Sequence, residues 1–465
     1  MGETPNGENP ATTLDLDDKK ADRDKLARSP VGFEEHSQRI SVLGELHARP
    51  LLPTEIPRAV FHFGFMTDEA AAIADRARVA DMAKARGLPS PDAHAKYHRF
   101  DFGRWDLRWE QHTEFTTYTW STGISTGEPF SLANPLKDGE VQFTAPGPLI
   151  VAVNLSLLDR SKLMANVGDF FKPESLCVIK ASDGQARVAT DFVVDTSGFT
   201  RILVESKGMS ETHAGRLVQR VLEIETYRTL ALLGLPTARS IGPELGRMEK
   251  ELAQVTAEIA GADDHHESQV LLKHLGRLAA DIEALSAKNA FRFGATRAYF
   301  ELVKSRIELI QERPDADHVS ITAFFNRRLV PAIETCNAVE TRQERLSLQL
   351  ARAADLLRTG IQFDLEQQNR DLLKSMDQRA KMQLRLQQTV EGLSVAAISY
   401  YIVGLITYLA KGLSDLSPVP ERFSPTIVTA LSVPLVVGGV WYLTRRLKEH
   451  YVDDKADSDR SSKGG

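Results

Sequence analysis

Two apolar runs without a charged side chain stand out in the hydrophobic pattern, both near the carboxyl end. The first extends from Gly392 to Ala410 and the second from Thr426 to Leu443. In a helix, about 19 residues cover roughly 29 Å, which matches the hydrocarbon thickness of a bilayer. Pro434 in the second run is tolerated in a membrane helix. The pattern predicts two transmembrane helices, and the alternative for either run alone is a buried core helix.

The charges around these runs predict their orientation. Basic residues are denser outside the pair of runs than in the link between them. They are Arg379, Lys381 and Arg385 before the first run, and Arg445, Arg446 and Lys448 after the second. In the link, Lys411 and Arg422 are offset by Asp415 and Glu421. Because positive flanks stay in the cytoplasm, we expect a helical hairpin in the lipid bilayer with both termini on the cytoplasmic side.

Upstream, residues 33–207 alternate in the manner of strands. In "RAVFHFGFMT" from Arg58, Phe61, Phe63 and Phe65 alternate with His62 and Gly64, which predicts a strand. Asp68 then precedes an alanine-rich helix that reaches about Ala85. Further strands are predicted at "KYHRFDF", "DLRWEQHTEFTTYTWS", "PLIVAVNL", "SLCVIKAS", "ARVATDFVV" and "TRILVES". Strands with few helices between them indicate an α+β fold with a largely antiparallel sheet.

Residues 208–391 have a helical pattern instead. Ser210 caps a helix that ends near Gly234, and apolar residues then recur every three or four positions. They are Leu245, Met248, Leu252, Val255 and Ile259, and after a break Leu271, Leu275, Leu278, Ile282 and Leu285. We expect an antiparallel helical pair, a third helical region from about Ala298, and a fourth from about Pro331 into the first apolar run. This coiled-coil stalk is the predicted route to a homo-oligomer.

The predicted organisation is therefore a disordered leader, a cytosolic α+β domain, a helical region, the membrane hairpin, and a basic flank with a disordered tail. Their bounds are 1–32, 33–207, 208–391, 392–443 (spans 392–410 and 426–443) and 444–465. The leader is polar and resembles no export signal.

Composition narrows the function only slightly. The 465 residues carry a net charge of -6, which indicates no affinity for nucleic acid. The two cysteines, Cys177 and Cys336, are far apart, which argues against a disulfide framework or a zinc site and fits a reducing compartment. Asp263 to Glu267, "DDHHE", has metal-binding side chains but falls in a predicted turn, so we predict no metal site. No motif for a particular cofactor or catalytic residue is found.

Three groups of side chains are candidate ligand-binding residues. In "ELHARP", His47 and Arg49 follow a predicted helix end and can bind an anion, or simply pair with charges there. In the predicted strand 106–121, His112 and Glu114 share a face with Arg108 and Glu110, which also fits a cross-strand row of ion pairs. The third group lies on one helix and consists of Arg220, Glu223, Glu225 and Arg228. These residues also fit a network of charges in which Glu225 and Arg228 form a pair.

Four segments in this order resemble one family. They are "EEHSQRISVLGELHARP", "LRWEQHTEFTTYTW", "RVLEIETYRTLALLGLP" and "GLSVAAISYYIVGLITYLAKGL". Together they resemble the bacterial domain-of-unknown-function 3422 family over about Phe33 to Lys448. The resemblance implies a membrane-anchored protein in the bacterial inner membrane, and it implies no reaction.

Three classes of function remain open. In the first, the chain is an anchored oligomeric scaffold or sensor of unknown activity. In the second, the layout is similar to that of CorA-type magnesium channels, and one helical stripe supplies a packing or pore face: Ala397, Tyr400, Gly404 and Thr407. The Gly-Met-Asn signature of that family is missing, and Lys411 stands near its place. The third class is a membrane-tethered enzyme, for which no strong motif is found.

Overall fold

The computed structural model describes residues 36, 38–39, 42–43, 53–92, 95–125, 127–136, 143–163, 166–259, 261, 265–416 and 425–461. The predicted leader, His47 and Arg49 of "ELHARP", and the first two residues of "DDHHE" lie outside this part of the chain. The chain forms two compact units, residues 1–261 with 273–354 and residues 262–272 with 355–465.

The first unit is built on one sheet of nine strands. In sheet order the strands are β2 (Tyr97–Asp101), β3 (Asp106–Gln111), β4 (Phe115–Gly123), β1 (Arg58–Met66), β5 (Leu149–Asp159), β8 (Thr200–Ser206), β7 (Ala186–Val194), β6 (Cys177–Ala181) and β9 (Arg313–Pro314). All neighbours pair antiparallel except β5 and β8, which are parallel. The fold is therefore α+β with a mostly antiparallel sheet, as the alternation predicts.

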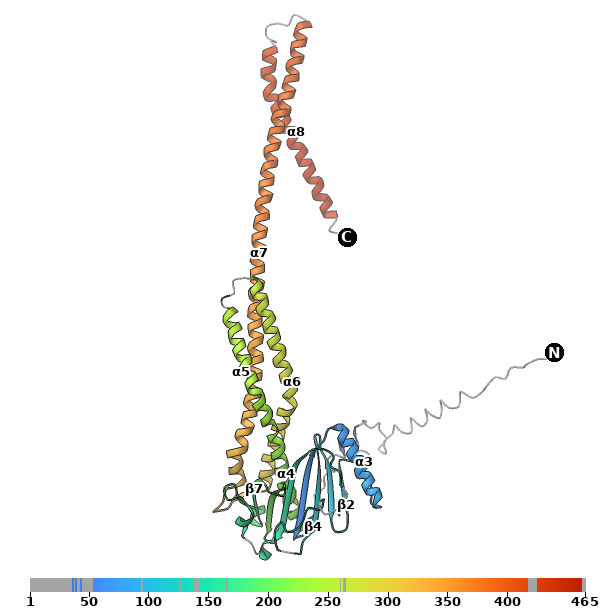
Figure 1. Cartoon of the computed structure of the whole chain (residues 1–465). Coiled ribbons are helices and arrows are strands. Elements are labelled where there is room, and N and C mark those ends of the chain that lie inside the picture. Colours follow the sequence, from blue (N-terminus) through green and yellow to red (C-terminus); the bar gives the residue numbers. More distant parts are fainter. Residues whose placement is uncertain are drawn as a thin grey trace, which may run out of the picture. The chain divides into compact units, whose positions relative to one another are not determined.

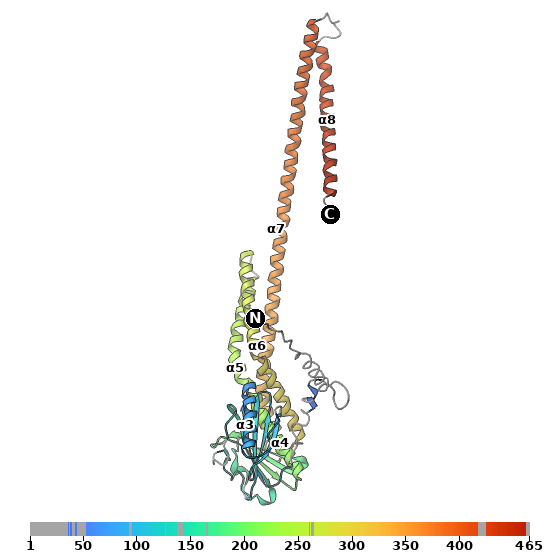
Figure 2. The ribbon, with the colours of Figure 1, turned by 90° about the vertical axis from the view of Figure 1, so that its right-hand side faces the viewer.

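The helices of this unit follow the predicted pattern in outline. They are α3 (Glu69–Ala85), α4 (Glu211–Leu232), α5 (Gly234–Ile259), α6 (His265–Leu309) and the first part of α7 (Ile321–Leu416), with short 3-10 turns at Arg160–Lys162, Val167–Phe170 and Ser182–Gly184. Asp68 and Ser210 cap α3 and α4 through their side chains, as expected from sequence. Figures 1 and 2 show α5, α6 and the first part of α7 side by side.

Strand β1 explains why the sheet is covered on both faces. It lies in the interior of the sheet, and its alternate residues belong to two different apolar clusters. Phe61, Phe63 and Phe65 pack with Val79 of α3, whereas Val60 packs on the opposite side with α4. Successive side chains of a strand point to opposite faces, so one alternating segment can hold two layers of helix.

The predicted strand over 106–121 is wrong, because the chain turns within it. Strand β3 ends at Gln111, β4 begins at Phe115, and the His112 amide donates to the Phe115 carbonyl at 2.8 Å. His112 and Glu114 therefore lie at the β3–β4 turn, and not in a row on one strand face. Neither residue 113 nor residue 114 is a glycine or a proline, the residues that usually indicate a turn in a sequence.

Two predicted helix boundaries are also wrong. The region near Ala298 is the interior of α6, which is one helix of 45 residues. Helix α7 begins at Ile321, so Pro331 lies inside it. Phe325, Leu329 and Ile333 are buried around this proline, and their packing outweighs the backbone hydrogen bond that proline removes.

The second unit contains the rest of α7, together with α8 (Pro425–Ser461). Both helices contain an 18-residue window with a mean hydropathy of 1.8, long and apolar enough to cross a membrane. Only 6% and 0% of these windows are buried. The two helices meet where the Thr407 and Thr429 hydroxyls lie 3.1 Å apart.

Candidate functional site

A polar seam crosses the otherwise apolar contact between α4 and the sheet. At its centre His62 of β1 is 4% exposed, with Nδ1 2.8 Å from the Thr119 hydroxyl and Nε2 3.0 Å from the Thr226 hydroxyl. Thr226 donates its own proton to the Leu222 carbonyl, so Nε2 of His62 donates and Nδ1 accepts. Burial, helped by the Arg108 charge, lowers the pKa of His62 to about 3. The imidazole is therefore neutral at physiological pH.

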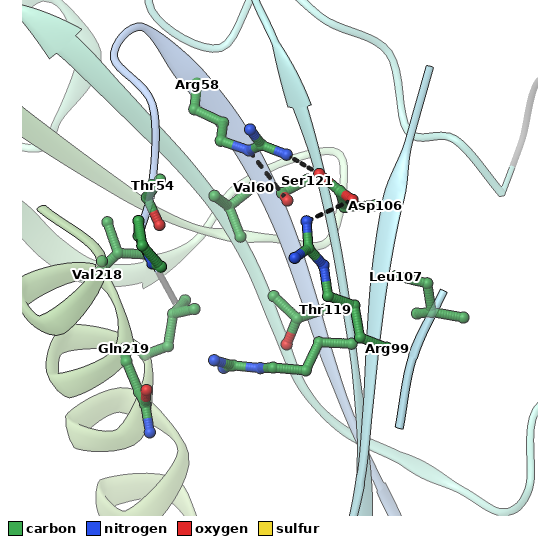
Figure 3. A pocket seen from close by; sticks show the side chains of 14 residues that line it. Thr54, Arg58, Val60, Arg99, Asp106, Leu107, Thr119, Ser121, Val218 and Gln219 are labelled. Atoms are coloured by element: carbon green, nitrogen blue, oxygen red, sulfur yellow. Dashed lines mark hydrogen bonds and ion pairs between the residues drawn. The ribbon is translucent and has the colours of Figure 1, made fainter. Parts of the chain in front are cut away.

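Beside this histidine lies a hollow that we call the arginine hollow. It has a volume of about 80 Å³ and lies between the strands β1 to β4 and the first half of α4. Three guanidinium groups and one carboxylate line it: Arg58, Arg99, Arg108 and Asp106. Figure 3 shows Val218 and Gln219 on the α4 side and the arginine side chains on the sheet side.

Asp106 holds two of these arginines. Its carboxylate accepts from Nη2 of Arg99 at 2.9 Å and forms an ion pair with Arg58. Arg58 also donates Nε–H to the Ser121 hydroxyl at 3.1 Å (Figure 3). The third arginine, Arg108, has its Nε 3.3 Å from a carboxylate oxygen of Glu110. The positive charge of the arginine hollow is thus largely balanced by the protein itself.

A smaller cavity of about 20 Å³ continues the seam along α4 and brings together two predicted residues. His112 and Glu223 both line it, next to Arg108 and Glu110. The His112 ring stacks flat on Phe115, with the ring centres 4.1 Å apart. Hence His112, predicted on a strand, and Glu223, predicted on a helix, line one cavity although 111 positions separate them (223 - 112).

The remaining members of the predicted groups have other partners. Glu223 pairs with Arg306 of α6 and accepts from Gln219 at 2.9 Å, and it forms no ion pair with Arg220 of the same predicted group. Arg220 instead donates to the Leu309 carbonyl at 2.7 Å. The predicted Glu225–Arg228 pair is present, with two hydrogen bonds of 2.8 and 2.6 Å.

Glu114 is separated from His112 in function because it faces a different helix. Its buried carboxylate forms a two-pronged ion pair with Arg292 of α6. Burial and the Glu114 carboxylate also raise the pKa of Tyr299, which lies further along α6. This arrangement joins the β3–β4 turn to α6, and Glu114 does not line the cavity that His112 lines.

The stripe predicted on the first apolar run is only partly packed within the chain. Tyr400 is 77% exposed and Ala397 is exposed, whereas Gly404 and Thr407 are half-buried. The residue that faces inward at this level is Ser399, which is 4% exposed. Of the predicted stripe, Thr407 therefore contacts α8, whereas Ala397 and Tyr400 stay exposed.

Sequence reasoning missed Arg58, Arg99 and Asp106, although one signal was available. In the β2–β3 hairpin, Arg99 and Arg108 are directly opposite each other. Like charges directly opposite each other destabilise a hairpin. Pairing the two predicted strands would therefore have indicated a local excess of positive charge.

No group of three or more His, Cys, Asp or Glu side chains suited to a metal ion occurs among the described residues. Both cysteines are buried, and burial raises the pKa of the Cys177 thiol to about 12. That thiol is therefore protonated at physiological pH and unreactive.

Taken with the site, the fold defines a class: a mixed α+β protein with a polar seam under one helix and two exposed apolar helices at its carboxyl end. More particularly, the chain belongs to the family described as protein of unknown function (DUF3422), whose model matches residues 34–451. That description assigns no activity. No curated protein and no solved structure matches the chain.

Proposed function

We propose that this protein is a sensor or scaffold anchored in the bacterial inner membrane, with its α+β unit facing the cytosol. One observation carries the proposal: the apolar windows of α7 and α8 are 6% and 0% buried. A core helix of a soluble protein would have most of such a window covered by its own chain. The apolar surface of these two windows must therefore be buried by something other than their own chain. The length of the windows fits the lipid chains of a bilayer.

The side chains of the windows support a lipid environment. Leu405, Leu409 and Leu435 are between 64% and 73% exposed. Burying a leucine side chain is worth about 1.5–3 kcal/mol, so leaving many in water would be costly. Trp441 and Tyr442, near the end of the second window, are 54% and 58% exposed and suit the headgroup level.

The contact between α7 and α8 supports a hairpin rather than two separate anchors. Thr407 and Thr429 lie within hydrogen-bonding distance across it, and Thr429, Ser432, Val436 and Val440 form a half-buried stripe on α8. Small polar residues that pair between helices are typical of helix contacts in membranes. With basic residues outside the hairpin, both termini are expected in the cytoplasm.

Self-association follows from a second stripe, which we call the heptad stripe. Ala397, Tyr400, Gly404 and Thr407 follow one another at steps of three or four residues, and the same steps continue toward the amino end of α7. The apolar residues at these positions are each between 60% and 73% exposed: Leu372, Met376, Leu386, Val390 and Leu393. Arg379 and Gln383 occupy two positions between them. A seam repeating every 3.5 residues is the pattern of a coiled coil, and we propose that a second copy covers it.

We also propose that the functional divisions of the chain are the ones indicated by its sequence. The α+β domain covers 33–207, the helical region 208–391 and the hairpin 392–443. In this division the helical region connects the polar seam, through α4, to the anchor.

The experiment for the anchor is fractionation of cells that express the full chain. We expect it in the membrane pellet after washing with high salt and with carbonate, and in the supernatant only with detergent. Recovery of the intact chain from the soluble fraction without detergent would overturn the proposal.

The experiment for orientation uses single engineered cysteines, since both native thiols are buried. A membrane-impermeant maleimide added to intact spheroplasts should label Pro418→Cys in the link and spare Ser458→Cys in the tail. Labelling of the tail but not the link would reverse the assigned orientation. Ion flux through the purified chain in liposomes would favour the channel-like alternative over the anchor.

A further inference from the structure

A second, larger hollow opens beside the first half of α4, away from the arginine hollow. Its volume is about 380 Å³, and its walls come from the turn between β6 and β7, from α4, and from the end of α6. We call it the β6–β7 hollow. Ligand sites for small molecules commonly measure about 300–1,000 Å³, so its size suits a small solute.

Two arginines of α4 line this hollow, and neither forms an ion pair with a carboxylate among the described residues. Arg216 and Arg220 are one helical turn apart and both line it. The Nε of Arg216 is buried and has no hydrogen-bond acceptor, and no carboxylate within the described residues forms an ion pair with Arg216. Arg220 donates to the Leu309 carbonyl, which is neutral.

The charge balance of the hollow is positive. Of the described carboxylates that line it, Asp183 is paired with Arg313 at 2.8 Å, which leaves Glu308 alone. Counted together with Arg313, the partner of Asp183, three guanidinium groups stand against two carboxylates, which gives a net charge of +1. Burial, together with the nearby charges of Arg216 and Arg306, lowers the pKa of Arg220. Burial is the largest of these causes, and the nearby Glu223 carboxylate acts against them.

The backbone around the hollow is strained at three positions. Ser182, Asp183 and Gln311 have φ values of 51°, 55° and 53°, although none is glycine. All three line the β6–β7 hollow. Residues held in this left-handed region concentrate at functional sites, where the surrounding structure maintains a conformation that the chain does not prefer.

The arginine hollow differs because its three arginines are already paired with carboxylates. There, Asp106 binds both Arg58 and Arg99, and Glu110 lies against Arg108. An incoming anion would have to displace these carboxylates. In the β6–β7 hollow neither Arg216 nor Arg220 forms an ion pair among the described residues, so an anion displaces no carboxylate from them.

We propose that the β6–β7 hollow binds a phosphate-bearing anion through Arg216 and Arg220. Guanidinium groups donate two parallel hydrogen bonds to phosphate oxygens, and a partly enclosed site strengthens such charged bonds. The phosphate can belong to a soluble solute or to a lipid headgroup. This inference supplies the ligand class of the proposed sensor and rests on that proposal for its biological meaning.

The experiment is isothermal titration calorimetry of the full chain, purified in detergent, with pyrophosphate as the probe. We expect saturable binding that weakens at least about tenfold in Arg216→Gln and in Arg220→Gln. The matched control is Arg247→Gln on α5, an arginine that is 58% exposed and pairs with Glu251, and it should bind as the wild type does. Absence of binding to the wild type, or equal binding by all four proteins, would overturn the proposal.

Two further arms identify the source of the phosphate. Inorganic phosphate tests a monoester-like dianion, and glycerophosphoglycerol tests the headgroup of an anionic lipid as a soluble diester. Tighter binding of either, with the same dependence on Arg216, supports the site and names its source. We expect Arg216→Gln to fold as the wild type does, because it removes no ion pair among the described residues. This variant should still sediment with membranes, so failure of the anion site is distinguishable from failure of the anchor.

Discussion

Glu114 and Arg292 form a two-pronged ion pair that connects the β3–β4 turn to the middle of α6, 178 positions further along the chain. The side chains are only 10% and 20% exposed. Solvent screens such a pair less than a surface pair, and removal of one partner leaves the other charge largely buried.

We therefore expect Glu114→Gln to lower the free energy of unfolding by about 1–3 kcal/mol, a value reduced from that of a fully buried pair because Arg292 retains some contact with water. Thermal unfolding of the detergent-purified chain, followed by circular dichroism, measures it. The matched control is Asp377→Asn, whose partner Lys381 is 69% exposed, and it should change stability by less than about 0.5 kcal/mol. Equal effects of the two variants would contradict this account of the pair.

His62 should make stability fall as the pH is lowered. Its pKa is about 3 in the folded chain against 6.5 for an ordinary histidine. The unfolded chain therefore binds a proton that the folded chain does not bind between these values. This contribution is fully present above pH 6.5 and declines below it by about 1.4 kcal/mol per pH unit.

Denaturant midpoints measured from about pH 7.5 to 4.5, a range that spans the ordinary histidine pKa, test this expectation. The His62→Gln variant should have a shallower dependence on pH than the wild type, although its stability at the upper end of the range is lower. His213→Gln, which removes an exposed histidine, is the control and should retain the wild-type slope. An unchanged slope in His62→Gln would show that the acid sensitivity arises elsewhere.

Asp75 is a buried acceptor for two donors on the sheet. Its carboxylate accepts from Trp109 Nε1 at 2.9 Å and from the Tyr118 hydroxyl at 2.7 Å, and it is 0% exposed. Asp75→Ala should lower the free energy of unfolding by about 2–5 kcal/mol, because each buried donor left without an acceptor costs about 1–3 kcal/mol. Asp81→Ala on the same helix, with a side chain 78% exposed, should have almost no effect on the same unfolding curve.

Gly234 allows α5 to begin in close contact with two other helices. A Cβ at this position would lie 2.4 Å from the hydroxyl of Thr296 on α6 and 3.3 Å from the sulfur of Cys336 on α7. Gly234→Ala should therefore destabilise the chain by about 1–3 kcal/mol. Gly246→Ala on the same helix meets nothing within 4 Å and should be neutral or stabilising by up to about 1 kcal/mol. Thermal unfolding of both variants separates the clash from the general preference of helices for alanine.

The heptad stripe should cross-link between copies. Under mild oxidation in membranes, Leu386→Cys should form a disulfide-linked dimer, since that residue lies on the seam that a second copy covers. Gln388→Cys, two positions away and off the seam, is the control and should remain monomeric on a non-reducing gel. Equal cross-linking at both positions would indicate random collision and contradict a specific coiled coil.

Local patterns were sufficient for much of the fold. The alternation around Phe61 located β1 and its two faces, and the caps Asp68 and Ser210 located two helix starts. These features depend on residues within one or two turns of each other, so a single segment contains the information. The β3–β4 turn escaped because His112 to Glu114 lack the usual turn residues, and the start of α7 escaped because Pro331 resembles a boundary.

The candidate site could be predicted only in part, for a related reason. Glu225 and Arg228 were recognised as a pair because they are neighbours on one helix. The partner of Glu223 was not recognised, since Arg306 lies 83 positions away on α6. The arginine hollow was missed because Arg58 and Asp106 meet only when β1, β4 and β3 are laid side by side.

By itself, the sequence determined the alternating and helical segments and the two apolar runs, since hydrophobic periodicity and length are properties of continuous chain. The tertiary structure alone decided which charges are balanced: those of Arg58 and Arg99 by Asp106, and that of Arg292 by Glu114, while the Nε of Arg216 is left without an acceptor. The physical reason is that charge pairing depends on distance in space. The fold brings together side chains that are far apart in the sequence, and their positions in the sequence do not indicate that they will be close.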